Sequence, residues 1–231
     1  MELLVVGVSR RADGRSLIGY GQVRPGNWGF TRLVAPTPSG VLYPEHHRMG
    51  ELVEPRPYDL IRVEAPWADG RAGQPENRVV DDTPWELLER PASRGYLERL
   101  EGEEVSEGPL FGTEGRSVRD RGDTGGESIL YVAPMDPRAI CRWDPSRERY
   151  LARLGFRAGG VSYELPLTDW HYATKLRSRG EGEWDLTRLG CRAPHGLRLL
   201  VTLGEPFHGW RYKMVESILA QRTLARFAAS A

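Results

Sequence analysis

The stretch Leu-Arg-Leu-Leu-Val-Thr-Leu-Gly-Glu-Pro-Phe-His-Gly-Trp-Arg-Tyr-Lys-Met-Val-Glu-Ser-Ile-Leu, residues 197–219, decides the fold of this chain. Its opening part has apolar side chains at every second position, namely Leu197, Leu199, Val201 and Leu203. That period is typical of a strand with one buried face. The Gly-Glu-Pro sequence at 204–206 then stops the pattern, so we predict a strand over residues 197–203 and a turn after it.

The second half of the stretch also alternates, between large apolar side chains (Trp210, Tyr212, Met214) and basic ones (Arg211, Lys213). A returning strand would place the apolar set on one face and the basic pair on the other. A helix over residues 212–227 competes, because apolar residues there also suit a period of 3.6. We favour a strand to about residue 218, followed by a helical, alanine-rich tail.

Segments at both ends of the chain carry a family resemblance. Near the C-terminus these are Gly-Val-Ser-Tyr-Glu-Leu-Pro-Leu-Thr-Asp (160–169) and the Val-Thr-Leu-Gly-Glu-Pro to Lys-Met-Val run (201–215). Near the N-terminus they are Leu-Leu-Val-Val-Gly-Val-Ser-Arg (3–10), the strand-like residues 28–34 and Gln-Pro-Glu-Asn (74–77). They resemble the closing and opening halves of the bacterial dual OB-domain proteins. The resemblance implies two tandem OB-like β-barrels, with no counterpart for about 101–127, and it implies little about function because OB barrels host many roles.

The first half of the chain has the pattern of short strands beside one helix. We expect strands over residues 2–8, 17–23, 28–34, 58–63 and 77–80, and the first is almost continuously apolar, which predicts burial on both faces or barrel closure. Thr-Pro-Trp-Glu at 83–86 has capping-box spacing, which predicts a helix that begins there, breaks at Pro91 and resumes over 96–100. Short strands separated by turn signals favour an all-β fold with minor helices.

The second half contains the clearest hairpin signal. Residues 150–156 alternate up to Ala-Gly-Gly at 158–160, and residues 161–167 alternate after it. Shorter strands are expected over 129–132 and 139–143. Thr168 or Asp169 can cap a short helix through Leu176, which the resemblance places between the third and fourth strands of a barrel.

A change of composition suggests the domain boundary. Residues 101–127 are rich in Glu, Gly, Asp, Arg and Ser, with few apolar anchors. We expect a first barrel with a C-terminal helix over 1–110, a polar linker over 111–127, and a second barrel with a helical tail over 128–231. A long surface loop of the first barrel is the alternative for 111–127.

Composition and charge narrow the class of protein. The chain has 231 residues, of which 39% are hydrophobic, and this describes a globular protein with a real core. No apolar run reaches the length of a membrane span and no leader precedes the first strand, so we expect a cytoplasmic protein with no membrane association. The formal net charge is zero, which removes the global basic character of many nucleic-acid binders. Cys141 and Cys191 match no metal or redox spacing and are expected to be buried thiols.

Catalytic and cofactor signatures are missing from the sequence. It contains no nucleotide-binding glycine fingerprint, nucleophile elbow or zincin helix. His46 and His47 with Asp81 and Asp82 could form a mixed metal site, but their spacing matches no common motif. We therefore expect no catalytic residue, no metal site and no cofactor.

Binding residues are better represented. Alternation puts Arg149, Arg153 and Arg157 on the strand face opposite Tyr150 and Phe156. Together with other basic and aromatic residues they form a predicted nucleic-acid site of seven side chains: Arg149, Arg153, Arg157, Arg211, Lys213, Trp210 and Trp28. Alternatively, the tryptophans fill the two cores and the arginines pair with carboxylates such as Glu148 and Glu164.

Three functions are compatible with these features. The favoured one is a non-catalytic module that binds single-stranded DNA or RNA, because OB barrels present a curved sheet face and the basic side chains supply phosphate contacts. The second is an adaptor that docks on a protein partner through exposed aromatic and arginine side chains, which the neutral charge favours. The third is an enzyme whose titratable cluster the sequence does not reveal.

Overall fold

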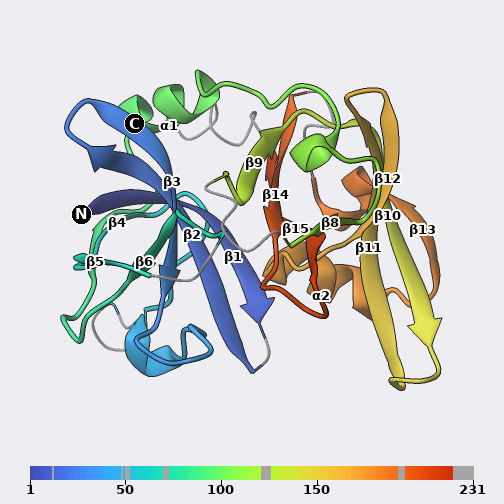
Figure 1. Ribbon diagram of the computed structural model, residues 1–231, viewed down its shortest axis with the longest axis horizontal. Coiled ribbons are helices and arrows are strands. Elements are labelled where there is room, and N and C mark those ends of the chain that lie inside the picture. The colour runs from blue at the N-terminus through green and yellow to red at the C-terminus, as the bar shows by residue number, and fades with distance from the viewer. Residues whose placement is uncertain are drawn as a thin grey trace. The chain divides into compact units, whose positions relative to one another are not determined.

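The computed structural model describes residues 1–11, 13–47, 49, 53–69, 73–120, 126–191 and 196–220 (Figure 1). The chain divides into two compact units, of which the first is built mainly from Met1–Glu103 and the second from Glu104–Gly122 and Ser128–Arg226. Strands dominate both, and the two α-helices are short, α1 (Arg94–Glu101) and α2 (Trp170–Ser178). The expected all-β class with minor helices is confirmed.

The first unit is one curled sheet. Its strands are β1 (Glu2–Arg11), β2 (Gly14–Arg24), β3 (Asn27–Val34), β4 (Leu60–Arg62), β5 (Trp67–Ala68), β6 (Asn77–Val79) and β7 (Glu86–Glu89), in the order β5-β6-β3-β2-β1-β4-β7. β1, β2 and β3 form an antiparallel meander, β4 pairs with β1, and β6 runs parallel to β3. Residues 63–66 alone join β4 to β5, although these strands lie toward opposite ends of the sheet order, and Asp81 N donates to the Glu64 carbonyl at 3.1 Å. The sheet therefore curls so that its ends approach each other, as in an OB barrel.

Close packing and a buried polar network hold the strands of the first unit together. β1 is buried on both faces from Leu3 to Ser9, as predicted. A Cβ atom on Gly19 of β2 would lie 2.7 Å from Leu3 Cβ, so glycine allows the two strands to approach. Residues 74–77 form a turn in which Asn77 Nδ2 donates to Gln74 Oε1 at 3.0 Å, and Arg32 Nη1 donates to Asn77 Oδ1 at 3.1 Å. This buried network holds β6 beside β3.

The helix predicted from the capping box at 83–86 is wrong. Trp85 is 3% exposed in the core of the first unit, and β7 begins at the next residue and pairs with β4. The helix α1 begins only at Arg94, after Ser93, and covers the predicted 96–100 segment. Burial of Trp85 and pairing with β4 outweigh the local capping signal, because tertiary contacts override propensity.

The second unit has two four-stranded sheets. Its strands are β8 (Ser117–Arg119), β9 (Ile129–Val132), β10 (Met135–Asp144), β11 (Arg149–Ala158), β12 (Val161–Pro166), β13 (Gly182–Asp185), β14 (Leu197–Leu203) and β15 (Trp210–Ala220). The sheet orders are β12-β11-β10-β13 and β8-β15-β14-β9. Since β9 leads directly into β10, these two act as one bent strand shared by both sheets. A parallel bridge from Leu167 to Val215 joins the end of β12 to β15, which gives the strand connections of an OB barrel.

The predicted hairpin and helix of the second unit are present. β11 and β12 are joined by Gly159 and Gly160, whose φ values of 54° and 77° lie in the left-handed region that a tight hairpin turn requires. Asp169 caps α2 by accepting a hydrogen bond from Tyr172 N at 3.0 Å. Short 3-10 helices complete the chain at Pro44–His46, Leu110–Gly112 and Leu186–Leu189.

The strand predicted over residues 197–203 lies at the centre of the second unit. β14 is flanked by β15 and β9, and Leu197, Leu199 and Val201 are 3%, 0% and 0% exposed, as predicted. Leu200 and Thr202 are also buried, so both faces of β14 are covered. β15 continues to Ala220, and the predicted helical tail lies outside the described residues.

The polar segment before β9 packs as part of the second unit. Leu110 is 2% exposed within the core of that unit, and β8 pairs with β15. Residues 104–120 therefore do not separate two barrels, and residues 121–125 of the predicted linker lie outside the described residues. Residues 110–120 are called the strap below.

Candidate binding surface

The basic pair of β15 is buried, contrary to the predicted place of Arg211 and Lys213 in a binding groove. Strict alternation is present, but Arg211 and Lys213 are 2% and 0% exposed, whereas Trp210 and Tyr212 are 45% and 47% exposed. The basic pair therefore points inward and the aromatic pair points outward. The expectation that Arg211 and Lys213 line a groove with the arginines of β11 is wrong.

The strap accounts for this burial, because it carries the acceptors that the inward cations need. Arg211 Nε donates to Asp120 Oδ1 at 3.0 Å, and Lys213 Nζ donates to the Thr113 carbonyl at 2.6 Å. Lys213 Nζ also lies 5.1 Å from the centre of the Tyr163 ring, a cation–π distance. Burial penalises the charged amine and lowers the pKa of Lys213 to about 8.

Further contacts fix the strap against β12 and β15. The Tyr163 hydroxyl accepts a hydrogen bond from Leu110 N at 2.9 Å and donates one to the Thr113 carbonyl at 3.0 Å. The β8 ladder pairs Trp210 with Arg119, and Arg211 with Val118. The strap is thus held by one buried apolar anchor, a short ladder and the two buried cations of β15.

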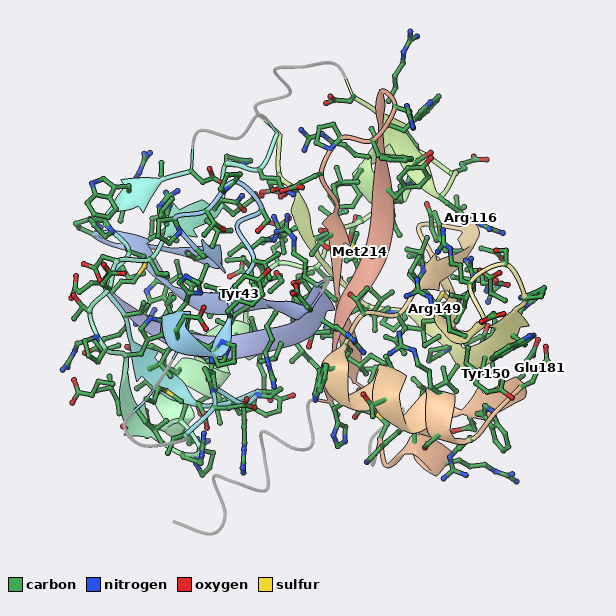
Figure 2. All side chains as sticks on the ribbon, turned by 90° about the horizontal axis from the view of Figure 1, so that it is seen from below. Tyr43, Arg116, Arg149, Tyr150, Glu181 and Met214 are labelled. Atoms are coloured by element: carbon green, nitrogen blue, oxygen red, sulfur yellow. The ribbon has the colours of Figure 1, made fainter. Side chains whose placement is uncertain are left out.

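The outward face of the β14–β15 hairpin is aromatic. Phe207, Trp210 and Tyr212, here called the aromatic strip, are 61%, 45% and 47% exposed. Phe207 N donates to the Trp210 carbonyl at 2.7 Å across a turn of His208 and Gly209, which both have positive φ. Figure 2 labels Met214, which is half-buried on the same face of β15.

One cation borders the aromatic strip. Arg119 of the strap is exposed, and it lies directly opposite Trp210 in the β8–β15 ladder, so the two side chains share a face. Within the described part of the chain, no hydrogen bond or ion pair occupies its guanidinium. Arg116, labelled in Figure 2, is a second exposed arginine of the strap.

The arginines of β11 share one face, as predicted, but two of them have carboxylate neighbours. Arg153 Nε lies 3.6 Å from a Glu164 oxygen, and Arg157 Nη2 lies 3.0 Å from Asp136. Arg149, labelled in Figure 2 at the start of β11, is exposed and has no such partner among the described residues. This face is therefore largely charge-balanced, as the ion-pair alternative predicts.

Trp28 is engaged within the first unit. The ring is half-buried, with its centre 5.7 Å from that of Tyr20 and 5.4 Å from that of Tyr96 of α1. Arg99 of the same helix places its guanidinium carbon 4.6 Å from the centre of the ring. These neighbours cover the indole, which leaves it less available for base stacking than Trp210.

The titratable residues do not assemble into a metal site within the described ranges. No group of three or more His, Cys, Asp or Glu side chains is placed to hold an ion there. His46 Nδ1 accepts a hydrogen bond from Tyr43 N, and Asp81 Oδ1 accepts one from Thr83 N. Cys141 and Cys191 are buried free thiols, as expected.

A buried carboxylate lies beneath the β14–β15 hairpin. Asp169 is 5% exposed, and its two oxygens accept hydrogen bonds from Tyr172 N and Ile218 N. Burial raises the pKa of Asp169 to about 6. Both hydrogen bonds are to backbone, so the side chain ties α2 to β15.

The family model for the dual OB-containing domain matches residues 1–218. The chain belongs to this family. The OB strand connections found in both units agree with that match, and OB folds are binding modules in general. No curated protein and no solved structure matches the chain. Within the described residues, no helix is long and apolar enough to cross a membrane.

Sequence reasoning named Trp210 but missed its neighbours. Tyr212 was placed on the same face as Trp210 but not in the predicted site, and Arg119 lies in the predicted linker. The available signal was the His-Gly dipeptide at 208–209 between Phe207 and Trp210, because glycine favours a turn and turns lie at the protein surface.

Proposed function

We propose that the protein is a non-catalytic module that binds single-stranded nucleic acid on the aromatic strip of its second unit, in the bacterial cytoplasm. The observation that carries the proposal is the exposure of Trp210 and Tyr212 on one face of β15, with the exposed Arg119 opposite Trp210. An exposed aromatic face beside an exposed cation suits a base and its phosphate.

The spacing of the two rings supports stacking. Side chains two residues apart in a strand are separated by about 6.8 Å, which suits consecutive bases of an extended single strand. Each base stacked on an aromatic ring contributes about 1–3 kcal/mol to binding, with little sequence preference. Phe207 extends the strip at the turn of the hairpin.

The electrostatic contribution is predicted to be small. The formal net charge is zero, and Arg153 and Arg157 already have carboxylate neighbours. Arg119 and Arg149 are the best candidates for phosphate contacts. Because the salt slope grows by about 0.7 for each phosphate neutralised on a single strand, we expect a shallow dependence on salt.

Fluorescence anisotropy of labelled oligonucleotides tests the proposal. The wild type should bind a single strand of thymidines more tightly than a duplex of the same length, at two salt concentrations. Trp210→Ala and Tyr212→Ala should each weaken binding about 5-fold to 150-fold, the range expected for loss of one stacked base. Trp67→Ala is the matched control, because Trp67 is 58% exposed on β5 of the first unit.

A protein-interaction adaptor is the second candidate. The observation that favours it is the charge-balanced face of β11 and β12, where Arg142 and Arg153 both approach Glu164. Paired charges of this kind suit a polar protein interface better than a phosphate backbone. If the wild type binds no oligonucleotide at low salt, the nucleic-acid function is refuted and the aromatic strip becomes the expected contact of a protein partner.

A further inference from the structure

The contacts that anchor the strap join residues that are far apart in the sequence. Arg211 and Asp120 are 91 residues apart, and Lys213 and Thr113 are 100 residues apart. Both cations are buried, and both point from β15 toward the strap. Nucleic-acid contact does not explain them, because neither side chain reaches the surface.

We infer that the strap is a separately docking element that controls the aromatic strip by bringing Arg119 beside Trp210. Arg211 and Lys213 are positioning residues that hold the docked strap. This inference rests on the proposed nucleic-acid function of the same surface, and it adds the regulation of that surface.

The strap can detach without unfolding the barrel. β8 has three residues and lies at the edge of its sheet, whereas β15 pairs with β14 along seven residue pairs. Loss of β8 therefore leaves the β14–β15 ladder intact. Short edge segments with few buried apolar contacts open at a lower free energy than the core strands.

Undocking changes the binding surface in a defined way. Trp210 and Tyr212 keep their place on β15, but the cation that faces Trp210 leaves with the strap. The docked state should therefore bind a single strand more tightly than the undocked state. By reciprocity, bound oligonucleotide should hold the strap down.

Two substitutions loosen the strap at different contacts. Asp120→Asn weakens the acceptor of the buried Arg211, and Leu110→Ala removes the apolar anchor, which is 2% exposed. Asp136→Asn is the matched control, because Arg157 lies at the same 3.0 Å distance from Asp136 but its side chain is 50% exposed. Arg119→Ala removes the proposed phosphate contact while leaving the anchors in place.

Amide hydrogen exchange measures docking without any ligand. In the wild type, the amides of residues 117–119 should exchange faster than those of β11, through local opening. Asp120→Asn should raise their exchange rate at least tenfold and leave β11 unchanged, and Asp136→Asn should change neither. Exchange of β8 and β11 at one common rate, in the wild type and in Asp120→Asn, would show that the strap opens only with the whole unit and would overturn the inference.

Measurements of oligonucleotide affinity test whether the strap controls the aromatic strip. The Leu110→Ala, Asp120→Asn double variant should lose as much affinity as Arg119→Ala and show the same decrease in salt slope, about 0.7. Adding Arg119→Ala to the double variant should cause no further loss, because an undocked strap has already removed Arg119. Additive losses would overturn the control of the site by the strap.

The two proposals fail in different ways. If the wild type binds no oligonucleotide, the proposed function and the control of it by the strap both fall. The exchange rates of β8 are still measured in that case, and they support or overturn the separate docking of the strap by themselves.

Discussion

Replacement of Lys213 by Met tests whether this lysine is buried as a charge in the folded protein. Its amine is 0% exposed, and burial lowers its pKa from 10.5 to about 8. A group with a depressed pKa in the folded state adds stability above its unfolded pKa, and that stability is lost as the pH falls through its folded pKa. At about 1.36 kcal/mol per pKa unit, the wild type should lose about 3 kcal/mol between pH 10.5 and pH 7 from this group alone.

The Lys213→Met variant lacks this titration. Its methionine fits the same space, and the Thr113 carbonyl still accepts the hydrogen bond of the Tyr163 hydroxyl. Urea unfolding of the wild type and the variant at several pH values gives the difference in their free energies of unfolding. That difference should shift by about 3 kcal/mol in favour of methionine as the pH falls from 10.5 to 7.

Lys175→Met provides the control, because Lys175 is the other lysine of the chain and lies exposed on α2. The same chemical change there removes an exposed amine, so it separates the effect of burial from that of the substitution itself. A constant difference between the wild type and Lys213→Met across this range would refute the burial of the amine and, with it, the assigned contact to the strap.

Other predictions follow from single contacts. Asp169 has a raised pKa, so its stabilising contribution is complete below pH 3.8 and is lost as the pH rises through about 6. The free energy of unfolding of Asp169→Asn, measured by chemical unfolding, should therefore rise relative to that of the wild type by about 3 kcal/mol over that interval. Val201→Asp places a charge at a site that is 0% exposed and should cost several kcal/mol in a thermal or urea melt, whereas wild-type melting would mean that β14 is not central. Replacing both Arg153 and Arg157 with Ala should change the free energy of unfolding by only about 0.2–1 kcal/mol, and a larger loss would show that these ion pairs support the sheet.

Local patterns predicted the strands of the second unit well. Alternation over 150–167 and 197–203 identified the hairpin and the central strand, because apolar side chains at every second position are buried in both, although the other face of β14 is covered as well. The OB connections came from the family resemblance, since strand patterns alone do not specify which strands pair.

The same patterns could not decide which face of β15 is buried. Alternation shows that Arg211 and Lys213 share a face, but the choice of the inner face depends on Asp120 and Thr113, which are far away in the sequence. The strap was misjudged for a related reason. Its composition is polar, and its packing depends on Leu110 and on hydrogen bonds that no local period reveals.

The pairing of β8 with β15 determines where the protein can be divided. A recombinant fragment that starts at Ser128 keeps β9 to β15 but removes Leu110, Thr113 and Asp120. Arg211 and Lys213 would then lose these acceptors permanently and expose their charges along an open flank of the barrel, so the fragment should keep the barrel but be less stable and aggregate more readily. A fragment that starts at Glu104 retains every described contact of the strap, so it is the shortest piece expected to keep the stability of the second unit.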